Sequence, residues 1–174
     1  MANYQDIEGA CESYQNSCRK LHDAATEYAK AIVETIQRRG RIPAGAFKPH
    51  PPLPCRVNLE KNYPLADALR YDSQTHAWEL TTFLKVRGEK ADSPTDLVRL
   101  VFTIRQGADG YSIGLANSTI SVSVGRPSAS EWQALLDDFA GRVLESLVRF
   151  YAARPDRRLG ESGGHSVVEF HGAE

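Results

Sequence analysis

Few residues of this chain have side chains suited to catalysis or metal binding, and they lie far apart in the sequence. The five histidines are His22, His50, His76, His165 and His171. Asp137 and Asp138 are adjacent in a predicted helix, where neighbouring side chains point about 100° apart and do not converge on a substrate. Cys55 precedes Arg56, whose charge would favour the thiolate, but no candidate base accompanies it. We therefore predict no catalytic residues, no metal site and no cofactor.

Several motifs that carry known chemistry are also missing. The chain has no Gly-rich phosphate loop, no His-Glu-x-x-His and no Cys-x-x-Cys. We expect a non-catalytic protein. A small enzyme or ligand receptor whose site assembles from distant residues stays open as an alternative.

The composition bounds the class of protein. The 174 residues carry a formal net charge of -1, and 41% of them are hydrophobic. These values fit one globular domain, and the near-neutral charge removes the simplest argument for a nucleic-acid or membrane protein. The first residues do not form a secretory signal, and no apolar stretch approaches the ~18 residues of a membrane span. We expect a cytoplasmic protein with reduced thiols, since Cys11 and Cys18 would lie about 10 Å apart along a helix, too far for a disulfide.

The longest periodic pattern predicts a helix over residues 1–40. Its less polar positions alternate in spacing between three and four residues, which is a heptad-like seam. These positions are Tyr4, Ile7, Cys11, Tyr14, Cys18, Leu21, Ala25, Tyr28, Ile32 and Thr35. Gly40 follows at the point where a helix end favours a left-handed residue. Because the seam is only weakly apolar, we expect either the C-terminal helix of the same chain or a second chain to cover it.

Prolines dominate residues 41–75 and predict an extended connector. Pro51, Pro52 and Pro54 also have the spacing of a polyproline II docking peptide, with basic residues at both ends. A rigid connector between helix and sheet needs the same residues, and we favour that simpler interpretation.

The second half of the chain changes to a period of two. Four alternating runs, joined by short loops rich in Gly, Asp, Asn and Ser, predict an antiparallel meander. A broad apolar stripe from Trp132 to Tyr151 then predicts a helix that can cover a sheet face. Residues 76–153 thus form a meander plus a helix, and residues 154–174 form a polar tail whose short apolar run at 167–170 could add an edge strand. The predicted fold is one compact α+β domain with a long N-terminal helix, a four-stranded antiparallel meander and a C-terminal helix packed on the sheet.

The sheet face that points away from the predicted core carries basic and apolar side chains. They are Phe83, Lys85, Arg87, Arg99 and Arg105. This face could receive an acidic protein surface, a nucleic-acid backbone or the long helix. A platform for single-stranded nucleic acid needs several aromatic rings, and only Phe83 qualifies. Protein is therefore the favoured partner, and a nucleic-acid-binding module is the weaker alternative.

Together these patterns favour a non-catalytic module that binds a protein partner, of adaptor, chaperone, inhibitor or immunity type. We expect it to form a homo-oligomer through the seam and to have no membrane partner. The seam residues involved are Ile7, Cys11, Tyr14, Cys18, Leu21, Ala25, Tyr28 and Ile32. A lysine at Ala25 is expected to dissociate such an oligomer.

Overall fold

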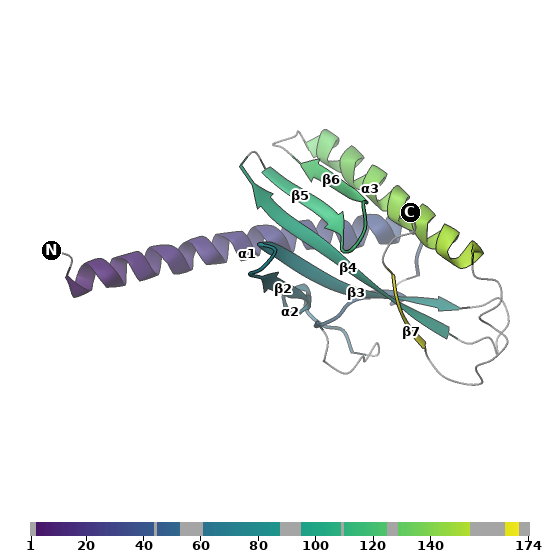
Figure 1. Cartoon of the computed structure of the whole chain (residues 1–174), viewed down its shortest axis with the longest axis horizontal. Helices are drawn as coiled ribbons and strands as arrows, with labels where there is room; N and C mark the ends of the chain where they lie inside the picture. Colours follow the sequence, from purple (N-terminus) through teal and green to yellow (C-terminus); the bar gives the residue numbers. More distant parts are fainter. Residues whose placement is uncertain are drawn as a thin grey trace.

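Two long helices and one sheet make up the fold (Figure 1). The structure, a computed structural model, describes residues 3–43, 45–52, 61–87, 95–108, 110–124, 129–153 and 166–170. The helices are α1 (Tyr4–Gly40), the short α2 (Leu65–Ala68) and α3 (Ala129–Ala152). The strands are β1 (Phe47–Pro49), β2 (Leu69–Asp72), β3 (Ala77–Arg87), β4 (Thr95–Gly107), β5 (Gly110–Leu115), β6 (Ser121–Val124) and β7 (Ser166–Glu169). The predicted α+β class is confirmed.

Strands β3, β4, β5 and β6 form the predicted antiparallel meander, each paired with the next along the chain. Three short strands extend it beyond the four predicted. Strands β1 and β2 both pair antiparallel with β3, and β7, in the apolar run of the tail, pairs parallel with β4. Strands β1 and β2 were not predicted because they lie in the proline-rich stretch, where prolines argue against strands.

Helices α1 and α3 pack against each other on one face of the sheet, and the core lies between this face and the helices. Phe102 on β4 and Phe139 on α3 meet edge to face, with ring centroids 6.1 Å apart. At the surface, Arg38 Nη2 of α1 lies 2.6 Å from Asp137 Oδ1 of α3. The other large side chains that are fully buried include Phe47, Ile32, Ile36, Leu80, Leu100, Ile104, Ile113 and Leu136. The predicted packing of the C-terminal helix on the sheet is confirmed.

Both ends of α1 have a local explanation. At the start, the Asp6 amide donates to Asn3 Oδ1 and the Asn3 amide donates to Asp6 Oδ2, a reciprocal capping box. At the other end the prediction for Gly40 is wrong, because Gly40 is still helical and Arg41 takes the left-handed conformation, with φ of 48°. A Cβ on Gly40 would lie 3.1 Å from Leu144 Cδ2. The glycine therefore serves the close approach of α3.

Prolines do not keep all of residues 41–75 irregular. The described part of this stretch contains β1, α2 and β2, while residues 53–60 lie outside it. Among the described residues, no helix is both long and apolar enough to cross a membrane.

Candidate interaction surfaces

Helix α1 extends well beyond the sheet, as Figure 1 shows, so that the two ends of its seam have different environments. Every residue from Tyr4 to Leu21 is exposed. We call Tyr4–Leu21 the projecting segment; at 1.5 Å per residue it is about 27 Å long. Further along the same seam, Ala25 is 0% and Ile32 is 1% exposed. The seam is thus exposed at its N-terminal end and buried at its C-terminal end.

The buried end of the seam is covered by the chain itself. The Tyr28 ring lies 4.4 Å from the ring of Tyr111 on β5 and 5.0 Å from that of Trp132 on α3. Burial, with a smaller contribution from Tyr111, raises the pKa of Tyr28. Ala25, Tyr28 and Ile32 therefore pack within one chain. A lysine at Ala25 would place a charge in the core and would test folding rather than association.

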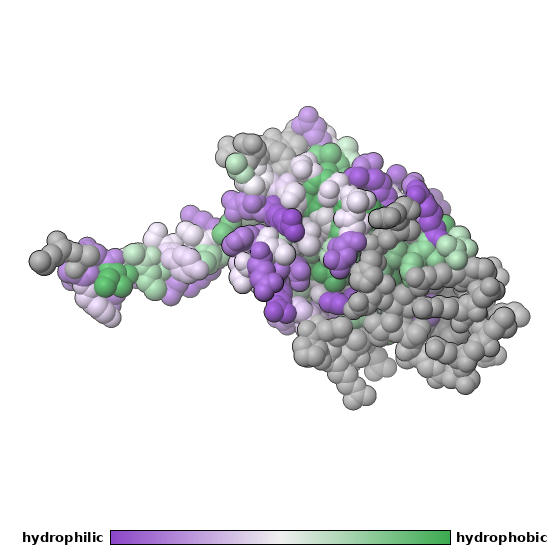
Figure 2. Space-filling model, viewed as in Figure 1, coloured by the Kyte–Doolittle hydropathy of each residue, from purple (hydrophilic) through white to green (hydrophobic). Residues whose placement is uncertain are grey.

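The projecting segment concentrates exposed hydrophobic side chains. Of the six large exposed hydrophobic residues among the described ones, four lie here: Tyr4, Ile7, Tyr14 and Leu21. Figure 2 shows hydrophobic residues along this segment between hydrophilic ones. Cys11 and Cys18 complete the seam as exposed cysteines that form no disulfide. The pKa of Tyr14 is raised, chiefly by its hydrogen bond with Cys18.

The charges of the projecting segment are divided along its length. The acidic residues Asp6, Glu8 and Glu12 lie in its first part. The basic residues Arg19 and Lys20 lie at its end. They are next to the body of the protein, which the sheet, α3 and the buried half of α1 form. The segment therefore has an acidic outer end and a basic inner end.

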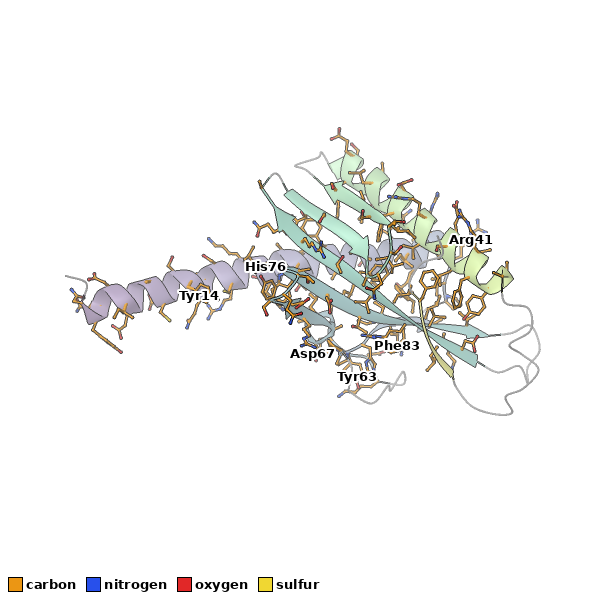
Figure 3. All side chains as sticks on the ribbon, in the orientation of Figure 1. Tyr14, Arg41, Tyr63, Asp67, His76 and Phe83 are labelled. Carbon is orange, nitrogen blue, oxygen red and sulfur yellow. The ribbon has the colours of Figure 1, made fainter. Side chains whose placement is uncertain are left out.

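An aromatic group lies where the projecting segment joins the body (Figure 3). The Trp78 ring of β3 lies 5.2 Å from the ring of His22 on α1 and 5.3 Å from that of Tyr71 on β2. The Tyr71 hydroxyl lies 3.2 Å from His76 Nδ1. Sequence reasoning missed this group because its members come from a helix and a distant hairpin. The only local signal was an aromatic residue on each side of the turn at residues 73–76.

The basic sheet face differs from the prediction at Phe83. This ring is 0% exposed because His50 covers it, with centroids 5.1 Å apart, and Tyr63 lies 4.9 Å beyond His50. The backbone holds His50 there, since its amide donates to the Thr81 carbonyl at 3.0 Å. Phe83 and Tyr63 are both labelled in Figure 3. Phe83 is therefore part of the protein interior and cannot contact a partner.

The remaining basic residues differ in exposure, and Arg105 lies apart from Arg99. Lys85 and Arg99 are half-buried and Arg105 is exposed. Arg105 is six positions beyond Arg99 on β4, which is about 20 Å. The side chain of Arg87 lies outside what the structure describes. The continuous basic and aromatic face that a nucleic-acid platform requires is not found among the described residues.

The candidate docking peptide is only partly described. Pro51 and Pro52 are half-buried, and His50 Nδ1 lies 2.8 Å from the Pro51 carbonyl oxygen. Pro54 lies outside the described residues. These contacts tie the start of the proline run to the sheet, as a connector requires.

Cys55, His165 and His171 lie outside the described residues, and the two adjacent aspartates of α3 each pair with an arginine. Asp137 pairs with Arg38, and Asp138 Oδ2 lies 3.0 Å from Arg142 Nε one helical turn away. Within the described ranges, no three or more His, Cys, Asp or Glu residues form a group that could hold a metal ion.

Comparison with known proteins adds no family to these observations. No family model matches the chain, and no curated protein or solved structure is significantly similar to it. The functional proposal therefore rests on the surfaces described above.

Proposed function

We propose that this protein is a non-catalytic protein-binding module that self-associates through the seam of its projecting segment. The observation that carries the proposal is the change of environment along one stripe of α1. Ala25 and Ile32 are almost completely buried, whereas Tyr14, on the same stripe, is 71% exposed and Ile7 is 63% exposed. Exposed hydrophobic residues gathered on one side of an element are typical of an interaction site.

The composition of the projecting segment supports the same proposal. It contains Gly9, Ser13, Asn16 and Ser17, all weak helix formers. The Ser17 hydroxyl donates to the Ser13 carbonyl at 2.9 Å, a bond that slightly disfavours the helix. Isolated helices of this length are marginal in water and gain most of their stability from packing. A second copy of the chain would supply that packing.

The proposed location and role follow from the same surface. Two exposed thiols on the seam suit a reducing compartment, and we place the protein in the cytoplasm. An adaptor, chaperone, inhibitor or immunity role needs a rigid body joined to a contact surface. The body formed by the sheet, α3 and the buried half of α1 fits this description.

A matched pair of lysine variants tests the proposal. Ile7→Lys places a charge on the exposed seam, while Asn16→Lys places the same charge on the opposite side of the same helix. We expect the wild type and Asn16→Lys to dimerise and Ile7→Lys to stay monomeric, measured by light scattering from about 1 μM to about 1 mM. At a protein concentration where all three are monomeric, the urea midpoint of the body should be the same, because neither residue contacts the body of its own chain.

Two results would contradict self-association. The first is a wild type that stays monomeric over the whole concentration range. The second is an equal loss of association in both lysine variants, which would indicate an effect of net charge rather than contact through the seam.

A further inference from the structure

We infer that two copies pair their projecting segments antiparallel, about a two-fold axis that passes between Glu12 and Ser13. This inference rests on the proposed self-association and specifies its geometry. It makes the second copy the occupant of the exposed seam and places the two bodies at opposite ends of a short two-helix rod.

The spacing of the seam fits this axis. It places Tyr4 opposite Leu21 of the second copy, Ile7 opposite Cys18, and Cys11 opposite Tyr14. Each of these three pairs joins a larger side chain to a smaller one or to a leucine. The two-fold axis generates every pair twice, once on each side of the axis. All six seam residues of the projecting segment therefore find a partner, which is the arrangement expected of helices packed knobs into holes.

The body of the protein excludes the parallel alternative. In an in-register parallel pair, the two seams face each other along their whole length. From Ala25 onward, each seam faces its own sheet and α3, as the burial of Ala25, Ala29 and Ile32 requires. The two bodies would then occupy the same space. The antiparallel pair avoids this collision because each body lies beyond the N-terminal end of the other helix.

The charges of the projecting segment favour the same orientation. The antiparallel axis brings the acidic outer end of one helix level with the basic inner end of the other. A parallel pair would instead place the two acidic outer ends level with each other, and the two basic inner ends likewise. Complementary charge between the ends of two helices favours one orientation even where it adds little affinity.

The aromatic group at the base of the segment extends the contact. The register places Tyr4 of the second copy level with Leu21, next to His22 and Trp78. Tyr71, which is 48% exposed, borders the same position. An aromatic ring arriving there would contact other rings, an arrangement that adds to the energy of simple burial.

Disulfide trapping tests the orientation. The first variant combines Ile7→Cys, Cys11→Ala and Cys55→Ser and keeps Cys18. In the antiparallel register the thiol introduced at position 7 faces Cys18 of the second copy, so oxidation should yield a covalent dimer. The two positions are about 16 Å apart within one helix and cannot be bridged internally.

The matched control adds Cys18→Ala to the same background, so that each chain keeps only the introduced thiol. The two thiols of a dimer would then be about 16 Å apart in the antiparallel arrangement and adjacent in a parallel one. We expect a disulfide-linked dimer from the first variant and none from the control, read by mass spectrometry and non-reducing electrophoresis. Light scattering of both reduced variants reports whether the non-covalent dimer is present.

The other outcomes separate the two proposals. A dimer that is trapped in the control is parallel and overturns the inferred orientation, while self-association stands. A dimer trapped in neither variant also overturns it, because the contact would then lie elsewhere. Reduced variants and a wild type that all stay monomeric would overturn both proposals.

Discussion

Replacing Gly9 by alanine should tighten the dimer. Gly9 lies on α1 opposite the seam, and a Cβ added there has no heavy atom within 4 Å. The added methyl group therefore neither clashes with the body nor enters the proposed contact. Its effect is on the helix alone, because alanine is more favourable than glycine in a helix interior by about 1 kcal/mol.

The size of the effect depends on whether the projecting segment is helical before it pairs. If the segment frays in the monomer and becomes ordered in the dimer, each chain contributes about 1 kcal/mol to association. Two chains contribute about 2 kcal/mol, which corresponds to a Kd lowered by roughly 30-fold. Sedimentation equilibrium of the wild type and Gly9→Ala measures this ratio directly.

Gly141 offers a matched control. It lies in α3, where an added Cβ would meet Arg39 Nη2 at 3.8 Å, an ordinary van der Waals contact. Gly141→Ala should raise the free energy of unfolding of the body by up to about 1 kcal/mol and leave the Kd of the dimer unchanged. A Kd for Gly9→Ala within two-fold of the wild-type value would refute the coupling between helix formation and pairing.

Three further predictions concern the body of the protein. Phe139→Ala should lower its free energy of unfolding by about 3–5 kcal/mol, measured by urea denaturation, because the ring is fully buried against the sheet. Thr75→Val removes the hydroxyl that donates to Asp72 at 2.6 Å and chiefly holds the pKa of Asp72 below 3.8. In the variant, an NMR titration should show a higher pKa for Asp72. The wild type loses stability as pH falls through the lowered pKa of Asp72, and the variant should lose less. Burial raises the pKa of Tyr28 above 10.0 in the folded state. The free energy of unfolding should therefore fall as pH rises from 10.0 through the raised pKa. In Tyr28→Phe, urea midpoints should show a smaller alkaline decline; an unchanged decline would contradict the assignment.

The architecture could be predicted from sequence where the pattern was long. Strands β3 and β4 have 11 and 13 residues, enough for alternation to show which side chains face the core. Helix α1 was recognised for the same reason, from ten seam positions. The short strands β1 and β2 are held by pairing with β3, which is information from outside their own sequence.

The interaction surfaces could be predicted only in part. Spacing identified the seam, but a period of three and four residues is the same whether a sheet or a second chain covers it. The change from an exposed seam up to Leu21 to a buried seam from Ala25 onward became visible only when the position of the sheet was known. The prediction that Phe83 lies on the surface was wrong, because His50, 33 positions earlier in the sequence, covers its ring. Contacts over such separations leave no local pattern.

The late position of β7 has a consequence for synthesis. The stretch of β4 around Leu97 and Val98 has β3 on one side and β7 on the other, and the Phe170 amide donates to the Arg99 carbonyl at 3.2 Å. A ribosome makes β4 some 70 residues before β7. Until β7 emerges, this backbone presents unpaired amides and carbonyls to neighbouring nascent chains, the setting in which strands from different molecules join wrongly. Truncation just before Ser166 should therefore shift the protein from the supernatant to inclusion bodies.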